Sequence, residues 1–282
     1  MVDIFDRNQV RHNRARASAK FQDHGFLFDW SKSQLLERIS DINRIFSKAL
    51  QIGSRAPILA AEHSKIGDIA TLDLTNKPVQ CCDIYIQASE EFLPIKQNSM
   101  DLVVSNLSLH SVNDLAGALI QINDCLKSDG LFIASMLGGE TLHELRKIMM
   151  EVEISMFDGA SPRIAPFADK PQMGELLQRA KFALPVVDSD IITVTYDNVF
   201  KLLHDIRYMG EGNAIYKRNK SYLGKAFFMQ VAQKYHEQFA EKDGRITASF
   251  EVIFLIGWKP HKSQQQPLPR GSGKVSLGEV LK

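Results

Sequence analysis

"KALQIGSRAPILA", residues 48–60, has the outline of a short strand that runs through a glycine turn into a helix. In a doubly wound α/β domain, the carboxyl end of such a strand is where a nucleotide-type cofactor binds. The turn from Gly53 to Pro57 holds one glycine, where a cofactor-binding turn usually holds two or three. The stretch therefore predicts an α/β fold with a cofactor site, and raises the question whether this turn still accommodates the cofactor.

The sequence on both sides of this turn alternates between short apolar segments and helical patterns. Strands are predicted at residues 48–52, 69–74, 80–87, 101–109, 131–137, 187–196 and 248–258. Helices are predicted at residues 33–46, 57–64, 113–127, 140–157, 172–182, 199–209 and 225–242. This alternation is typical of βαβ units, whose parallel sheet is covered on both faces. We predict a doubly wound, mostly parallel sheet with a helical insertion, at about residues 197–242, between the last two strands.

The chain divides into three parts by pattern and composition. Residues 33–258 are predicted to form one α/β domain, and residues 1–32 precede it as a basic helical arm. Residues 259–282 are rich in Gln, Pro, Gly and Ser, which is typical of an irregular segment. We expect this tail to end in a short helix.

The arm carries Arg7, Arg11 and Arg14 at helical spacing. Such a stripe can contact phosphate or an acidic partner, but no aromatic residues interleave with it as in a nucleic-acid platform. We interpret the stripe as a solvated helix face. The formal net charge of +1 produces no overall field that selects nucleic acid or a membrane surface.

The bulk features predict a cytoplasmic protein without a transmembrane segment. No apolar run approaches the roughly 20 residues of a membrane span, and "MVDIFDRNQV" is neither apolar like a secretory signal nor free of acids like a transit peptide. The chain has three cysteines, which indicates reduced thiols and excludes a zinc site of four cysteines. "HELRK", residues 143–147, lacks the second histidine of the helical zinc motif. We expect no metal site.

Polar residues follow the predicted strands, where ligands bind in an open α/β sheet. Asp73 stands 20 residues after Gly53, which suits a carboxylate that accepts the ribose hydroxyls, or else caps the following turn. Ser89 or Glu90 can hydrogen-bond an adenine amine, or else belong to a polar loop. Asn106 is expected to line the floor of the cleft.

Residues beyond these strand ends are candidates for substrate contacts. His110 lies just past the fourth strand, and a lone histidine of this kind is more often structural. Four polar residues crown the helix after the fifth strand: Glu140, His143, Glu144 and Arg146. They either bind substrate or form a solvated first turn, with carboxylates near the helix dipole. The sequence assigns no catalytic residue.

The stretch "EEFLPIKQNSMDLVVSNLSLHSVNDLAGALIQINDCLKSDGLFIASMLGGETLHELR", residues 90–146, resembles the seven-stranded, Rossmann-like S-adenosylmethionine-dependent methyltransferase family. More narrowly it is similar to the mitochondrial complex I assembly factors described as arginine hydroxylases, through "SPRIAPF", "MGEGNA" and "IGWKPHKSQ" as well. The malonyl-carrier-protein methyltransferases of biotin synthesis are broader relatives, with a resemblance expected to cover only the cofactor domain.

The resemblance implies a sheet with a reversed last strand and S-adenosylmethionine as the cofactor. It places cofactor contacts at Gly53, Asp73, Ser89, Glu90 and Asn106. It also implies a protein partner, a subunit of respiratory complex I, and no nucleic acid.

The chain departs from the family pattern at the turn of the opening stretch. Gln51 replaces an acidic residue, and Arg55 and Pro57 stand at glycine positions, while Ser111 stands where Trp is common. The glycines allow the methionine part of the cofactor to lie against bare backbone, a space that a guanidinium can fill. Two hypotheses stay open: an enzyme that uses S-adenosylmethionine, as a methyltransferase or arginine hydroxylase, and a non-catalytic assembly factor with a degenerate site.

Overall fold

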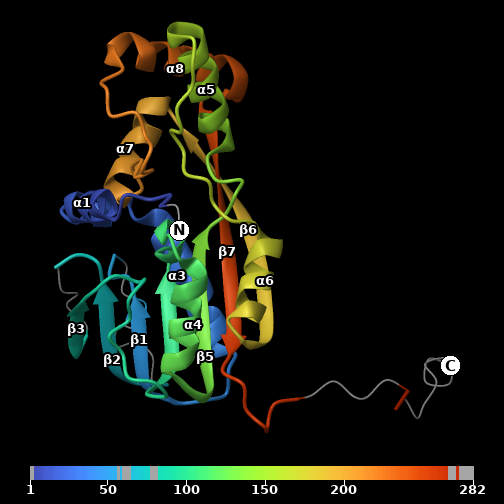
Figure 1. The fold of residues 1–282 in the computed structure, drawn as a ribbon. Coiled ribbons are helices and arrows are strands. Elements are labelled where there is room, and N and C mark those ends of the chain that lie inside the picture. Colours follow the sequence, from blue (N-terminus) through green and yellow to red (C-terminus); the bar gives the residue numbers. More distant parts are fainter. Residues whose placement is uncertain (1–2, 56–57, 59–64, 77–81, 266–270, 273–282) are drawn as a thin grey trace, which may run out of the picture.

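The computed structural model describes residues 3–55, 58, 65–76, 82–265 and 271–272. Its centre is a seven-stranded sheet in the order β3-β2-β1-β4-β5-β7-β6 (Figure 1). The strands are β1 (Phe46–Ile52), β2 (Ile66–Asp73), β3 (Ile84–Gln87), β4 (Met100–Asn106), β5 (Leu126–Leu137), β6 (Ala183–Tyr196) and β7 (Ile246–Trp258). Neighbouring strands are parallel except at β7, which runs antiparallel to both β5 and β6. The predicted doubly wound, mostly parallel sheet with one reversed strand is confirmed.

Helices cover both faces of this sheet. They are α1 (Arg7–Ala17), α2 (Phe21–His24), α3 (Phe26–Ser40), α4 (Leu115–Cys125), α5 (His143–Phe157), α6 (Lys170–Arg179), α7 (Val199–Met209) and α8 (Gly224–Phe239). Alternate residues of the central strands enter two apolar clusters, one beneath α3 and the other beneath α4 and α6. Each fully buried aliphatic or aromatic side chain contributes about 1.5–3 kcal/mol to this core. Among the described residues, no helix is both long and apolar enough to cross a membrane.

The helix predicted at residues 33–46 is placed differently. Helix α3 ends at Ser40, and Phe46 already belongs to β1. Ser33 lies inside the helix, where its hydroxyl donates to the carbonyl of Trp30 at 2.7 Å and therefore caps nothing. The Lys65 ammonium donates to the carbonyls of Ser40 and Ile42, both at 2.8 Å, and so satisfies acceptors at the end of the helix. The helix predicted at residues 57–64 lies outside the described residues except for Ile58.

The predicted helical insertion is formed by α7 and α8, which lie between β6 and β7 in the chain. With α5 they gather beyond one end of the sheet (Figure 1). Asn198 caps α7 by accepting a hydrogen bond from the Lys201 amide at 3.1 Å. The helix stops at Gly210, whose φ of +86° is the left-handed conformation typical of a helix end.

The N-terminal arm lies across the carboxyl ends of the parallel strands (Figure 1). The amide of Asp6 donates to the carbonyl of Ala214 at 2.8 Å, and the amide of Phe5 donates to Asn113 Oδ1 at 2.7 Å. The arm therefore joins the loop before α4 to the loop after α7, and closes the edge of the sheet where ligands bind in this architecture.

The interpretation of the arginine stripe as a solvated face is wrong for two of its three members. Arg7 and Arg14 both pair with the fully buried carboxylate of Glu90, whereas Arg11 is exposed. Arg7 and Arg14 lie two turns apart on one helix face, so both reach this carboxylate. The sequence showed the stripe but not the acid that it covers.

The tail is irregular in the part that the structure describes, residues 259–265 and 271–272. The short helix predicted at its end lies outside the described residues.

Candidate functional site

The turn after β1 keeps its one glycine for a steric reason. Gly53 has a φ of +88°, and a Cβ built on it would fall 2.0 Å from Ser108 Oγ. Gln51, at the position of the expected acid, spans the turn. Its amide donates to the carbonyl of Gly53 at 2.9 Å, and its side-chain oxygen accepts from the Ile58 amide at 2.9 Å. The turn is therefore held in shape by a neutral side chain.

Asp73 ends β2 and holds the backbone on both sides of the cleft. One carboxylate oxygen accepts from the Ser54 amide and the other from the Thr75 amide, each at 2.7 Å. The turn-capping alternative is therefore present in the structure. Each carboxylate oxygen has a second lone pair, so the group retains capacity for a ribose hydroxyl. The ribose role of Asp73 stays a prediction.

A polar groove of about 470 Å³ borders the ends of β2 and β3. It is lined by Thr75, Asn76 and Gln87, and by Asn8, Arg11, His12 and Ala15 of α1. Its position next to Asp73 and its polar lining fit the nucleoside half of S-adenosylmethionine.

Glu90 binds the N-terminal arm through two ion pairs. Its carboxylate is fully buried and pairs with Arg7 and, at 2.5 Å, with Arg14. Burial opposes ionisation, but the charges of Arg14 and Arg7 outweigh it and lower the pKa of Glu90 to about 2. Ser89 Oγ likewise accepts from Arg7 at 3.4 Å. Adenine contacts by Ser89 and Glu90 remain predictions, because both side chains already contact the arm.

Asn106 is buried at the end of β4 and joins three elements, while its predicted place on the floor of the cleft stays a prediction. Its amide donates to the carbonyl of Phe28 in α3 at 3.0 Å, and its side-chain oxygen accepts from Ser135 Oγ of β5 at 3.0 Å. Both polar atoms of this buried side chain are therefore satisfied within the protein.

Arg55 extends from the turn into the interior instead of into solvent. Its guanidinium donates to the carbonyls of Leu107 at 2.6 Å and Met209 at 3.0 Å, and pairs with Glu211. It also lies 4.5 Å from the ring centre of Phe28. Burial lowers the pKa of Arg55, an effect that the Glu211 charge opposes. Pro57 lies outside the described residues.

This arrangement bears on the methionine half of S-adenosylmethionine, which carries an ammonium, a sulfonium and a carboxylate, and therefore a net positive charge. Arg55 contacts two acceptors beyond the turn, the carbonyl of Leu107 and the carboxylate of Glu211. A fixed cation at this place repels the ammonium and the sulfonium and attracts only the carboxylate, so its net effect on the methionine half is repulsive. The residues present therefore fit the nucleoside half of the cofactor better than its methionine half.

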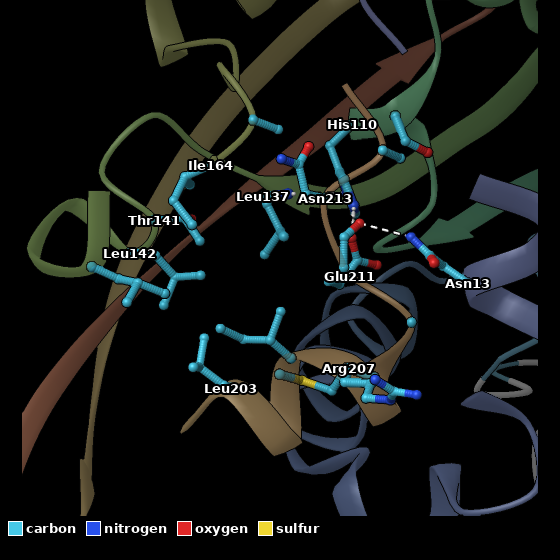
Figure 2. A pocket seen from close by; sticks show the side chains of 18 of the residues that line it. Asn13, His110, Leu137, Thr141, Leu142, Ile164, Leu203, Arg207, Glu211 and Asn213 are labelled. Carbon is cyan, nitrogen blue, oxygen red and sulfur yellow. Dashed lines mark hydrogen bonds and ion pairs between the residues drawn. The ribbon is translucent and has the colours of Figure 1, made fainter. Parts of the chain in front are cut away.

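A second, larger cavity of about 560 Å³ lies among the arm, the insertion and the sheet. Its walls are mainly apolar, with Leu137, Leu142 and Leu203 at the sides, and His110 and Glu211 meet at one end (Figure 2). His110 Nε2 lies 2.9 Å from Glu211 Oε2. Burial opposes the charge of Glu211, but His110 and Arg55 lower its pKa well below the usual range.

The polar residues after β5 divide by burial. Glu144 is buried and accepts from Ser249 Oγ at 2.6 Å, while Arg146 donates to the carbonyl of Gly139 at 3.0 Å. Glu140 and His143 are exposed. Thus neither the substrate-binding group nor the solvated turn describes all four residues.

Sequence reasoning missed Glu211, which pairs with both His110 and Arg55. Glu211 lies in "MGEGNA", a segment that drew attention only through its similarity to the complex I assembly factors. Glu211 is more than 100 positions from each partner in the sequence, so no local pattern connects them.

Comparisons with known proteins agree with this fold. A family model described as a methyltransferase domain matches residues 50–134. A Bacillus halodurans protein assigned as a methyltransferase superposes with a TM-score of 0.55, at 15% identity, over 82% of this chain and 99% of its own. The 1,6-didemethyltoxoflavin-N1-methyltransferase of Burkholderia thailandensis, solved with S-adenosylhomocysteine, gives a TM-score of 0.50 at 14% identity, over 90% and 88%. The family model and the fold define a methyltransferase-like protein with the fold of S-adenosylmethionine-dependent enzymes.

Relatives that match the whole of this chain identify a particular family within this class. The chain is 37% identical to "Arginine-hydroxylase NDUFAF5, mitochondrial" of Danio rerio over 100% of this chain and 90% of the relative. It is 40% identical to the protein of the same name from Homo sapiens, over 100% and 84%. The chain therefore belongs to the NDUFAF5 family.

More distant relatives correct one expectation. The malonyl-[acyl-carrier protein] O-methyltransferase of Gallionella capsiferriformans is 28% identical over 91% of this chain and 92% of its own length. This resemblance was expected to cover only the cofactor domain. It extends over most of the chain.

Proposed function

We propose that this protein modifies an arginine side chain of a protein substrate, held in the 560 Å³ cavity between the arm and the insertion. The names of its full-length relatives specify arginine hydroxylation, and those matches include every element that builds the cavity. By family resemblance, we propose a subunit of respiratory complex I as the substrate.

The observation that carries this proposal is the guanidinium already bound at the cavity wall. Arg55 is held by the Glu211 carboxylate, two backbone carbonyls and the face of Phe28, and both Glu211 and Phe28 also line the cavity. A carboxylate and an aromatic face are the two groups that recognise a guanidinium most strongly. Apolar walls suit the aliphatic stem of an arginine.

Hydroxylation, the reaction in the relatives' names, adds one oxygen atom to arginine. If dioxygen is the oxidant, its second oxygen atom leaves as water, with two electrons and two protons from a reductant. We assign to this chain's residues only the binding part. Glu211 pairs with Arg55 through Oε1 and with His110 through Oε2, and we assign the remaining lone pair of each oxygen to the substrate guanidinium.

We also propose S-adenosylmethionine as a ligand, with its nucleoside beside Asp73 in the polar groove. The cofactor, when bound, supplies a methyl group on a sulfonium. The position of Arg55 supports weak binding of the methionine half. We propose a cytoplasmic location for this protein, as its sequence predicts. The names of the animal relatives place those proteins in mitochondria.

A second candidate is a non-catalytic assembly factor. It is favoured by the two arginine pairs, Arg55–Glu211 and Arg14–Glu90, which close the cleft from both sides. A third is methyl transfer to a carrier protein, favoured by the match to malonyl-carrier-protein methyltransferases.

Mass spectrometry of complex I subunits separates these candidates. Peptides would be compared between cells of the source organism with the gene, without it, and with the gene restored as wild type, Glu211→Gln or the exposed control Glu241→Gln. We expect one arginine that carries the added mass of one oxygen, lost on deletion and restored by wild type and Glu241→Gln, but not by Glu211→Gln. An added methylene would indicate methyl transfer, and no change in any arginine would favour the non-catalytic candidate.

A further inference from the structure

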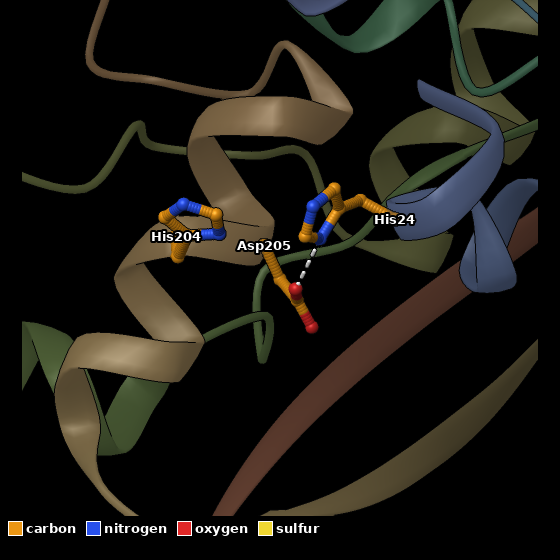
Figure 3. A group of neighbouring side chains, drawn as sticks. All are labelled: His24, His204 and Asp205. Carbon is orange, nitrogen blue, oxygen red and sulfur yellow. Dashed lines mark hydrogen bonds and ion pairs between the residues drawn. The ribbon is translucent and has the colours of Figure 1, made fainter. Parts of the chain in front are cut away.

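Helices α2 and α7 bring three metal-binding side chains together away from the cofactor turn. His24 comes from α2, and His204 and Asp205 come from α7 (Figure 3). One ligand atom from each lies within 4.8 Å of the other two. His204 also lines the 560 Å³ cavity, so the cluster borders the space assigned to the substrate.

We propose that His24, His204 and Asp205 bind one divalent transition-metal cation at the wall of this cavity. Two imidazoles and one carboxylate suit Fe²⁺, Co²⁺, Mn²⁺ or Zn²⁺, and three protein ligands leave coordination positions open. This inference does not rest on the proposed function, because metal binding is measured without a substrate.

The distances are close to those that a cation requires. Metal–ligand bonds of about 2.1 Å place neighbouring ligand atoms roughly 3 Å apart. His24 Nδ1 and Asp205 Oδ1 are 2.6 Å apart, and a hydrogen bond joins them. A cation would replace the shared proton with little movement of these two groups.

His204 has the larger distance to close, and its surroundings permit that movement. The side chain is exposed, and the structure gives it no hydrogen bond among the described residues. A rotation about its side-chain torsions therefore breaks no polar contact. The His24–Asp205 pair accounts for two members of the cluster by itself, so His204 is the residue that distinguishes a metal site from an ion pair.

Two tyrosines support the three side chains. The ring of Tyr208 stacks on His24, with centroids 5.0 Å apart, and meets the edge of His204 at 4.4 Å. The stacking holds the plane of the His24 imidazole, as residues that surround a metal site usually do, while exposed His204 contacts Tyr208 only edge-on. The buried hydroxyl of Tyr196 lies near Asp205 and has no hydrogen-bond partner in the described part of the chain. A tyrosine hydroxyl at this place can donate a hydrogen bond to the Asp205 carboxylate.

The donor set links the cluster to the chemistry named for the relatives. Two histidines and one carboxylate with open positions are the ligands of non-heme iron oxygenases. The sequence predicted no metal site, because neither its cysteines nor its local histidine motifs have the spacing of one. His24 and Asp205 are 181 positions apart, so no spacing motif connects them.

The test uses the full chain after treatment with a chelator. Co²⁺ is titrated by calorimetry and visible absorption, and Fe²⁺ is added without oxygen and measured after gel filtration. The variants are His204→Ala and Asp205→Ala, with His236→Ala, an exposed histidine of α8, as the matched control. Circular dichroism checks the fold of each variant, and His204→Ala decides if Asp205→Ala does not fold, because His204 is exposed.

We expect wild type and His236→Ala to bind one equivalent of cation with the same affinity. His204→Ala should bind at least about tenfold more weakly, the scale for losing a group at a metal site. The proposal is overturned if wild type shows no saturable binding, if His204→Ala binds as wild type does, or if His236→Ala weakens binding equally.

Discussion

Three residues at the turn after β1 set its shape and the charge beside it. Gly53 permits the turn, Gln51 ties it together, and Arg55 fills the acceptors beyond it. The sequence identified all three positions, because each departs from or retains a glycine-turn pattern. It did not show where the Arg55 guanidinium goes, since its partner Glu211 is 156 positions away.

Gly53→Ala should destabilise the protein by about 1–3 kcal/mol, because a Cβ would combine a left-handed φ with a clash against Ser108. The matched control is Gly244→Ala, which has a φ of +81° but open space around its Cβ position. Urea unfolding of both variants measures the difference. Equal losses would show that the turn relaxes around the added methyl group.

Glu90 predicts a pH dependence of stability. Its pKa is about 2 in the folded chain, against an ordinary value of 4.5. Because the folded pKa is depressed, the carboxylate contributes stability above pH 4.5 that is lost as the pH falls towards 2. Glu90→Gln should cost about 3–5 kcal/mol at neutral pH and flatten this part of the curve.

The measurement is the free energy of unfolding from pH 2 to 7, with the exposed Asp190→Asn as the control. An unchanged curve for Glu90→Gln would contradict the assignment of the ion pairs with Arg7 and Arg14.

At the scale of elements, the sequence predicted the sheet and its insertion well. Alternating apolar runs and helices specify βαβ units, and the order β3-β2-β1-β4-β5-β7-β6 follows the expected fold. The start of helix α3 was misplaced because a serine at the beginning of an amphipathic run, such as Ser33, is a typical N-cap, yet the Ser33 hydroxyl donates to the carbonyl of Trp30 within the helix. The docking of α1 was missed because it depends on long-range pairs with Glu90, which no local pattern contains.

Helix α7 contains His204 and is followed directly by the loop with Glu211, so the cap at Asn198 also helps to position these two residues. Asn198→Ala should destabilise the protein by about 0.5–2 kcal/mol, because the Lys201 amide loses its acceptor. Asn198→Asp should restore most of this loss, since aspartate is an equally good cap. Thermal unfolding of the three proteins is the check, and a similar loss for both variants would mean that the cap bond is not the cause.

In the whole molecule, ion pairs connect the N-terminal arm, the insertion and the turn after β1 to one another across the methyltransferase fold. Arg14 and Glu90 join the arm to the sheet, and Arg55 and Glu211 join the turn to the insertion. The polar groove beside Asp73 is the place that we propose for the nucleoside, and the Arg55 guanidinium lies beyond the turn, where we propose that the methionine half of the cofactor binds. We predict that the Arg55 guanidinium, more than any lost contact to the nucleoside, limits the binding of S-adenosylmethionine.

Calorimetric titration of wild type beside Arg55→Gly, with S-adenosylmethionine and with adenosine, tests this claim most directly. Adenosine is the control, because it lacks the methionine half and its groove does not include Arg55. We predict that Arg55→Gly binds S-adenosylmethionine at least about tenfold more tightly than wild type, a gain of roughly 1.4 kcal/mol. Adenosine should bind both proteins alike. Tight wild-type binding without a gain in the variant would contradict the claim, as would an equal gain for adenosine.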